Sequence, residues 1–297
     1  MKRYLVGYSA DKGGCEALRL GAMLARSAGG SVVAAVILPE TWDHPSPAMV
    51  DVEYVQFLER HAEKTLAAAR AEMPADVPAE FLHHHAESAG AGLLALAEQM
   101  DVDAIVLGSS RKAPMSRFQE GTVAAEVLRS ARVPVALAPR GYVAPQERLD
   151  RITCAIASSS RSTELAHKAG EIAATFHVPL RLATFIVRDR QMYPSGAGYD
   201  VENLVSNKFL SQAHAAHDRI RAEWTGSRTG SAPPDSVFGD GRSWKEAVGE
   251  LDWTGCELLV IGSSRLGPLL RVFVGSNSGK ILRHAPVPRM IVPRLAE

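Results

Sequence analysis

The sequence is poor in cysteine and in aromatic residues. Of its 297 residues, 3 are Cys and 6% are aromatic. Cys15, Cys154 and Cys256 lie far apart, so they form neither a metal-binding spacing nor an evident disulfide framework. Disulfide frameworks mark oxidising compartments, so their absence makes the cytoplasm the expected location.

The chain also lacks an excess of charge and any long apolar run. Lys plus Arg and Asp plus Glu each number 33, which excludes the basic surface of a general nucleic-acid binder. No apolar segment approaches the ~20 residues of a membrane span. The opening "MKRYLVGYSADKGG" has neither the apolar stretch nor the cleavage site of a signal peptide. Neither a nucleic acid nor a membrane is therefore an expected partner.

What the sequence does contain is a repeat. The stretch "VLGSSR" at 106–111 returns as "VIGSSR" at 260–265, and about fifteen of the thirty-eight positions from Asp103 to Arg140 are identical at this offset without a gap. Self-similarity at a fixed offset marks a duplicated unit. We therefore expect two domains, residues 1–143 and 149–297, joined by a polar segment that Pro145 interrupts.

Each half alternates strand-like and helix-like segments. Continuous apolar runs such as "SVVAAVIL" at 31–38 are typical of strands buried on both faces of a parallel sheet. Apolar residues at helical spacing predict a helix over 13–29 that ends on a glycine pair, and Ser88 can cap another. Strand–helix alternation indicates an α/β fold, with a parallel sheet covered by helices on both faces. In the first half the expected strands are 3–9, 31–38, 79–85, 103–109 and 134–139, and in the second 151–158, 179–187, 235–239, 256–263 and 288–293.

The repeated loop has the features of an anion site. Gly108 and Gly262 follow buried strands, at the edge where parallel sheets bind ligands. Gly121-Thr122 and Gly275-Ser276 then open helices, whose free N–H groups and positive dipole end favour an anion. The sequence has no Walker P-loop and no GxGxxG pattern, so neither of those nucleotide-binding motifs applies.

The paired segments resemble the universal stress protein family, whose hallmark is Gly, two residues, Gly, nine residues, then Gly followed by Ser or Thr. The stretch 260–293 is similar to that family's C-terminal half almost throughout. The resemblance covers both halves. It implies two tandem five-stranded parallel-sheet α/β sandwich domains (Rossmann-like, HUP-type), a homodimer beyond the intrachain pair, and ATP binding without dedicated catalysis.

The chain departs from the family pattern at two kinds of position. Arg111 and Arg265 replace the second glycine of the motif. If the family's second glycine adopts a positive φ, an arginine at that position would be strained. ATP-binding members usually carry an Asp after the first strand, where this chain has Ser9 and, approximately, Ala157. Asp11, two residues on, is a candidate substitute.

The expected ligand is an adenine nucleotide, ATP with Mg²⁺, in one or both halves. No catalytic residue and no resident metal are expected, so any ATP hydrolysis would be slow. The second half is favoured for phosphates, because Glu120 and Glu126 flank the first loop. The candidate nucleotide-binding residues are Ser9, Val36, Gly108, Ser109, Arg111, Gly121, Thr122 and Val123 in the first half, and Ala157, Thr184, Gly262, Ser263, Arg265, Gly275, Ser276 and Asn277 in the second.

Other functions remain open at this point. A nucleotide-free module for dimerisation and protein interaction, with degenerate ATP sites, fits the two departures. An enzyme of the related nucleotide-binding α/β superfamily would need further motifs. His83 and His85 share one face of a strand and could bind a metal, but no third ligand is identifiable. Ser158–Ser160 lacks the elbow motif of a serine hydrolase.

Overall fold

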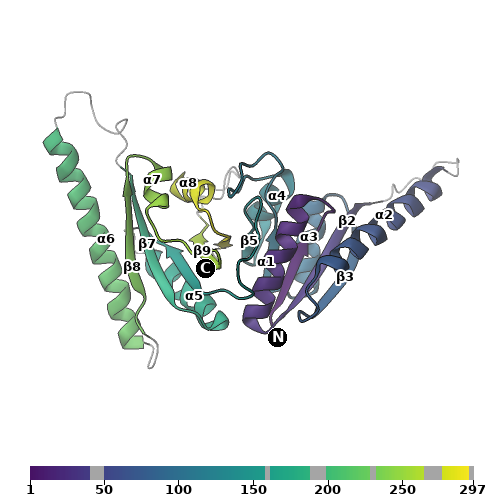
Figure 1. Cartoon of the computed structure of the whole chain (residues 1–297), viewed down its shortest axis with the longest axis horizontal. Helices are drawn as coiled ribbons and strands as arrows, with labels where there is room; N and C mark the ends of the chain where they lie inside the picture. Colours follow the sequence, from purple (N-terminus) through teal and green to yellow (C-terminus); the bar gives the residue numbers. More distant parts are fainter. Residues whose placement is uncertain (41–49, 158–160, 188–198, 228–231, 264–275, 294–297) are drawn as a thin grey trace. The chain divides into compact units, whose positions relative to one another are not determined.

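A computed structural model describes residues 1–40, 50–157, 161–187, 199–227, 232–263 and 276–293. The chain forms two compact α/β units (Figure 1): of the described residues, the first unit contains 1–148 and Pro293, and the second contains the others from Leu149 to Val292. The strand–helix alternation expected from the sequence is confirmed in both.

The first unit contains five parallel strands in the order β3-β2-β1-β4-β5. In chain order its elements are β1 Arg3–Gly7, α1 Lys12–Ala28, β2 Ser31–Pro39, α2 Val50–Glu72, β3 Ala79–Ala86, α3 Ala89–Gln99, β4 Ala104–Leu107, α4 Thr122–Ser130 and β5 Val135–Leu137. Helix α1 packs with α2, and α3 packs with α4, so helices cover both faces of the sheet.

The second unit repeats this arrangement with the parallel order β10-β9-β6-β7-β8. Its elements are β6 Arg151–Ala155, α5 Arg161–Phe176, β7 Leu180–Val187, α6 Tyr199–Ser227, β8 Asp235–Gly241, α7 Trp244–Gly249, β9 Glu257–Gly262, α8 Ser276–His284 and β10 Arg289–Val292. The two units share one topology, as a duplication predicts.

The core of each unit lies along its central strands. Leu5 and Val6 of β1 and Ile105 and Val106 of β4 are fully buried, and so is Ile152 of β6. Continuous burial along these strands explains why they are apolar at every position rather than at alternate ones.

Helix ends follow the expected capping chemistry. Asp11 caps the start of α1, and Gly29 ends it in the left-handed conformation at φ 61°. Ser88 caps α3, as the sequence predicts. These caps fix where α1 and α3 begin, next to the carboxyl ends of the strands.

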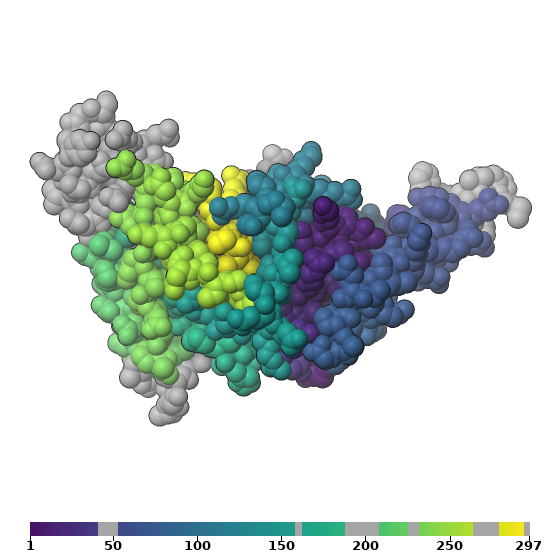
Figure 2. All heavy atoms as spheres, viewed as in Figure 1, coloured from purple at the N-terminus to yellow at the C-terminus, as the bar shows by residue number. Residues whose placement is uncertain are grey.

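Helix α2 is packed along only part of its length. From Ala62 onward, residues at helical spacing such as Leu66 and Ala69 are buried. Before that point Tyr54 and Phe57 are 57% and 59% exposed, and this part of α2 stands out from the body of the first unit (Figure 2). Its packed half begins at the turn that carries His61, beside the cavity described next.

A candidate nucleotide site in the first unit

A cavity of about 610 Å³ opens at the carboxyl edge of the first unit's sheet. The residues that end or follow β1, β2 and β4 line it, together with the first turns of α1, α3 and α4 and one side of α2. Open parallel sheets bind ligands at this edge, where the strand order reverses. All eight residues predicted for the first half line this single cavity: Ser9, Val36, Gly108, Ser109, Arg111, Gly121, Thr122 and Val123.

The cavity has an apolar part and an amide-rich part. Val36 and Leu38 from β2, Leu93 from α3 and Leu107 from β4 supply apolar side chains. The starts of α1 and α4 supply backbone N–H groups. A ligand with a flat apolar portion and an anionic portion matches this division.

Two cavity residues come from a helix that the sequence motifs did not point to. His61 and Thr65 of α2 line the cavity, four residues apart and therefore on one face of the helix. The His61 ring stacks on Phe57 with ring centroids 6.3 Å apart. Their position next to the buried stripe of Ala62, Leu66 and Ala69 is the signal that could have identified them.

Close backbone packing fixes the floor of the cavity. A Cβ atom on Gly108 would overlap the backbone of Gly13, and one on Gly14 would overlap the backbone of Ser9. Gly108 does not have a positive φ. A glycine is therefore required at position 108 because the end of β4 contacts the start of α1 directly.

The loop from Gly108 to Gly121 is held at both ends by hydrogen bonds. The Ser109 hydroxyl accepts a 3.0 Å bond from the Gln119 N–H, and the Ser110 N–H donates to the Gln119 carbonyl at 2.9 Å. The Ser116 N–H donates to the Arg140 carbonyl, and the Arg140 N–H donates to that of Arg117. The hydroxyl of Ser109 thus stabilises the loop.

The three helix starts at the cavity differ in how they are capped. Asp11 caps α1, accepting a 2.9 Å hydrogen bond from the Gly14 N–H, and Ser88 caps α3 through the Ala91 N–H at 3.0 Å. Helix α4 follows Gly121, which provides no side-chain cap. Within the described part of the chain, no side chain is found to accept from the first N–H groups of α4, and Thr122, Val123 and Ala124 line the cavity, where an anion can accept from these groups.

The carboxylates near α4 are arranged differently from what the sequence suggested. Glu126 accepts a 2.6 Å hydrogen bond from the Ser88 hydroxyl and so joins α4 to the start of α3. Glu120 is exposed and does not line the cavity. Neither carboxylate is among the residues that line the cavity.

Among the described residues, Asp11 is the carboxylate that lines the cavity. The Ser9 hydroxyl donates to it at 2.8 Å, and Arg111 Nε donates at 3.1 Å. Burial acts to raise the pKa of the Asp11 carboxyl, but the hydrogen bonds from Gly14, Ser9 and Arg111 outweigh it and hold the pKa below its usual value. Burial likewise raises the pKa of Tyr8, beside it, to about 12.

Arg111 is not strained. Among the described residues, the non-glycine residues with positive φ are Asp101, Ser116 and His177. The condition under which an arginine would be strained, a positive φ, is therefore not met at Arg111.

The second unit is described in part at the corresponding edge. Gly262 ends β9, and Ser263 donates its N–H to the Val292 carbonyl at 3.1 Å. The Ala157 N–H donates to the Ser162 hydroxyl at 3.1 Å. Ser276 and Asn277 are the first residues of α8, while Arg265 and Gly275 lie outside the described residues. The preference for a second-unit phosphate site stays a prediction.

Thr184, predicted to lie near the base in the second unit, is engaged by its neighbours. Its hydroxyl donates to the Ile156 carbonyl at 3.0 Å and lies 2.9 Å from Nε2 of His217. The His217 ring packs on Phe238, with centroids 4.5 Å apart. The register equates Thr184 with Val36 of the first unit, because Gly7 pairs with Ala35 as Ala155 pairs with Ala183.

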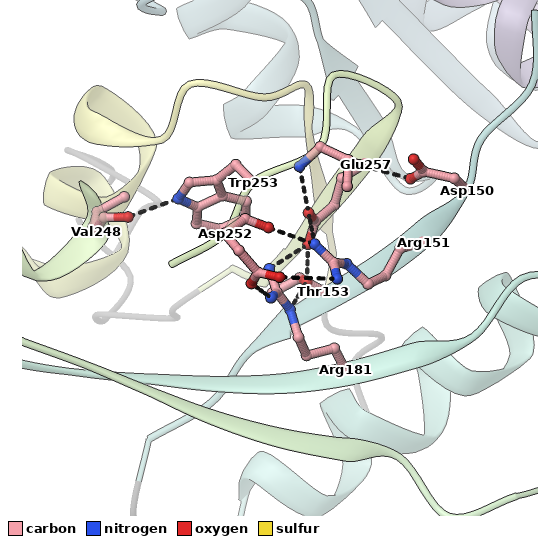
Figure 3. Close-up of polar contacts among 9 residues, drawn as sticks. Asp150, Arg151, Thr153, Arg181, Val248, Asp252, Trp253 and Glu257 are labelled. Carbon is pink, nitrogen blue, oxygen red and sulfur yellow. Dashed lines mark hydrogen bonds and ion pairs between the residues drawn. The ribbon is translucent and has the colours of Figure 1, made fainter. Parts of the chain in front are cut away.

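A buried ion network lies at the opposite, amino-terminal edge of the second unit's strands (Figure 3). Glu257 of β9 is fully buried and accepts 2.8 Å hydrogen bonds from Arg151 of β6 and Arg181 of β7. The Thr153 hydroxyl and the Thr254 N–H also donate to it. Arg181 pairs further with Asp252 and lies over the Trp253 ring.

Two members of this network, Thr153 and Arg181, lie where the first unit has apolar core residues. Thr153 pairs with Arg181 in the register where Leu5 pairs with Val33. Both Glu257 oxygens are hydrogen-bonded within the unit. The network therefore serves packing and does not present an open binding site.

Two further expectations can be compared with the described residues. The rings of His83 and His85 meet edge to face with centroids 5.9 Å apart, in line with their shared strand face. Within the described ranges, no group of three or more His, Cys, Asp or Glu side chains is arranged to hold a metal ion. None of the helices in those ranges has the length and apolar character needed to cross a membrane.

Comparisons with known proteins agree with this architecture. The model of the universal stress protein family matches residues 1–139 and 148–293. The universal stress protein Rv2319c of Mycobacterium tuberculosis (strain ATCC 25618 / H37Rv) is 35% identical over 294 residues, covering 97% of this chain and 99% of that protein.

Solved structures show the same fold. A universal stress protein from Archaeoglobus fulgidus DSM 4304 matches with a TM-score of 0.65 at 16% identity, covering 99% of this chain and 98% of that one. A universal stress protein solved in complex with cAMP covers 47% of this chain and 98% of its own, with a TM-score of 0.35 at 15% identity. At that score the likeness says nothing about a ligand of this chain.

The two family matches, the relative similar over nearly the full length and the repeated five-stranded units lead to one conclusion. This chain belongs to the universal stress protein family and carries two of its domains in tandem.

Proposed function

We propose that this protein binds an adenine nucleotide, ATP in particular, in the cavity of the first unit, and acts in the stress response as a regulatory or protective factor. The observation that carries the proposal is the uncapped start of α4 inside a cavity of about 610 Å³ whose other end is apolar. Phosphates would accept hydrogen bonds from the N–H groups of Thr122, Val123 and Ala124.

The base would lie at the apolar end of the cavity. Val36 and Leu38 of β2, with Leu93 of α3, offer a surface that a purine ring can pack against. The backbone of β2 ends here, so its polar groups can fix the ring's orientation. Family membership supports the choice of an adenine nucleotide over other ligands with the same two-part chemistry.

The cavity favours binding over catalysis. Asp11 is the carboxylate among its described residues, and it already accepts hydrogen bonds from Gly14, Ser9 and Arg111. A carboxylate held in this way, with a lowered pKa, is a poor general base for activating water. Mg²⁺ would be held mainly by the phosphates and water, as is common for this ion. We therefore propose that hydrolysis is slow.

The broader setting remains as the sequence predicts. We propose a cytoplasmic homodimer that has neither a nucleic acid nor a membrane as a partner. The balance of 33 basic and 33 acidic residues supports the absence of nucleic-acid binding.

Calorimetric titration of the full chain with ATP, ADP and AMP tests the proposal. We expect a stoichiometry of one nucleotide per chain if the first unit alone binds, and two if Gly275 and α8 form a second cradle. Replacing Gly275 by a bulky residue distinguishes these cases, because it should lower the stoichiometry only if the second unit also binds. No binding of any of the three nucleotides would contradict the proposal and favour the nucleotide-free interaction module.

The variant Gly121→Asp tests the position of the phosphates. Asp is a strong N-cap residue, so its carboxylate would occupy the α4 amides itself and repel an anion while stabilising the helix. We expect nucleotide binding in the first unit to be lost and the melting temperature to be maintained or raised. Gly121→Ala is the matched control, because its Cβ would meet only Ser110 Cβ, at 3.9 Å. Binding that survives Gly121→Asp would exclude this position for the phosphates.

A further inference from the structure

Arg111 links the two helix starts that flank the amide-rich part of the cavity. The preceding residue, Ser110, lies beside Gly121 at the start of α4. The Arg111 side chain extends from there to Asp11, the cap of α1, and Nε lies 3.1 Å from Asp11 Oδ2. The Arg111 side chain is 81% exposed and that of Asp11 26%. Arg111 therefore lies at the open rim of the cavity, while Asp11 lies deeper.

The ion pair uses only part of the arginine. Nε donates to Asp11, and among the described residues no acceptor is found for the N–H groups of Nη1 or Nη2. These two nitrogens carry four N–H groups in a rigid plane, a geometry that matches phosphate oxygens. Asp11 thus fixes the direction of the guanidinium and leaves its terminal nitrogens available.

The position of Arg111 relates it to a particular part of a nucleotide. Val123 and Ala124 of α4 line the cavity and are less exposed than Arg111, so a ligand whose base fills the apolar end would place its first phosphate near them. Further phosphates extend toward the open rim, where Arg111 is exposed. A nucleoside monophosphate would be satisfied by the α4 amides and would not extend as far as Arg111.

We propose that Arg111, oriented by Asp11, makes this site select nucleotides by phosphate number, binding a nucleoside triphosphate or diphosphate in preference to a monophosphate. This rests on the proposed nucleotide binding of the first unit. Arg111 would contact the outer phosphates, and Asp11 would act as a positioning residue through Arg111. Because Arg111 is largely exposed, solvent limits the preference it adds to about twofold to fivefold.

Titration of the full chain and three variants with ATP and AMP tests this selection. Arg111→Gly restores the family's glycine, and we expect it to weaken ATP binding by about twofold to fivefold while AMP binding stays nearly unchanged. Lys112→Gly is the matched control, since Lys112 is the neighbouring exposed cation and does not line the cavity. It should leave the ratio of the two affinities unchanged.

Asp11→Asn tests the positioning role. Asparagine caps a helix as well as aspartate does, so α1 is preserved while the charge that holds Arg111 is removed. We expect a lower ratio of ATP to AMP affinity, and no further decrease when Asp11→Asn is combined with Arg111→Gly. A purely structural role for Asp11 would lower both affinities together in both backgrounds.

The outcomes separate the two proposals. If the unaltered chain binds ATP and AMP but Arg111→Gly leaves their ratio the same, or tightens ATP binding, the selection by Arg111 is wrong and the nucleotide site stands. If Lys112→Gly lowers the ratio equally, general surface charge accounts for it and Arg111 has no specific role. If the unaltered chain binds neither ligand, both proposals fall together.

Discussion

Nε2 of His217 lies 2.9 Å from the hydroxyl oxygen of Thr184, and that hydroxyl donates its own hydrogen to the Ile156 carbonyl. Nε2 must therefore carry the proton and donate it to Thr184, which leaves Nδ1 as the unprotonated nitrogen. Nδ1 is buried and has no hydrogen-bond partner among the described residues. A second proton would place an unpaired charge inside the second unit.

The stability of the protein should consequently decrease in mild acid. Burial, and then the neighbouring His214, lower the pKa of His217 to about 4, with Asp218 opposing and Arg221 adding to the shift. Between about pH 6.5 and pH 4 the unfolded chain takes up a proton that the folded chain does not, so the free energy of unfolding decreases by up to about 3 kcal/mol. His217→Gln keeps the donor to Thr184 and cannot titrate. Urea denaturation over this pH range should show a flatter dependence for the variant, and an equal slope would contradict the assignment.

The ion network around Glu257 predicts that removing a buried charge lowers the free energy of unfolding much more than removing an exposed one. Glu257→Gln leaves Arg151 and Arg181 beside a neutral partner, and we expect the free energy of unfolding to decrease by about 3–5 kcal/mol. Glu98→Gln is the control, because Glu98 pairs with Arg132 at 3.7 Å with both side chains more than 80% exposed. Its loss should change stability by less than about 1 kcal/mol. Equal effects in chemical denaturation would show that the buried network is not as tightly coupled as its geometry indicates.

Gly108 and Gly121 should respond differently to the same substitution. Gly108→Ala places a Cβ against the backbone of Gly13, and we expect a loss of about 2–3 kcal/mol because neither backbone segment can move freely. Gly121→Ala meets ordinary contact distances and should cost less, about 0.5–1 kcal/mol, because alanine is a poorer N-cap than glycine. Thermal unfolding of the two variants compares them directly. Similar melting temperatures would mean that the end of β4 and the start of α1 can separate.

Much of the fold could be predicted because it is encoded locally. Buried parallel strands such as 31–38 are apolar at every position, and the glycine pair after α1 and Ser88 before α3 mark helix ends. The duplicated loop, in which two glycines lie thirteen residues apart in both copies, was expected at the carboxyl edge of the sheet, and Gly108 does follow the end of β4 there. The first-half residues chosen on this basis all line one cavity.

Other features depend on contacts between distant segments. His61 and Thr65 reach the cavity from α2, which carries no ligand-binding motif, so that their place beside the apolar stripe of the helix is the one signal for them in the sequence. Glu126 was expected to oppose an anion, but its carboxylate binds Ser88, thirty-eight residues earlier. The hydrogen-bonding partners of Arg181 are Thr153, Asp252 and Glu257, which lie far from it in the sequence. The sequence around Arg181 therefore gave no indication that this charged side chain would be buried.

The direct contact between Gly108 and Gly13 has a consequence for how sequences of this family are interpreted. A glycine after the fourth strand is demanded by the meeting of two main chains, whether or not any small molecule ever enters the neighbouring space. Selection on folding alone would retain it after a ligand had been abandoned. In other members of the family, the residue aligned with Arg111 is a better place to look for a change in what the pocket binds.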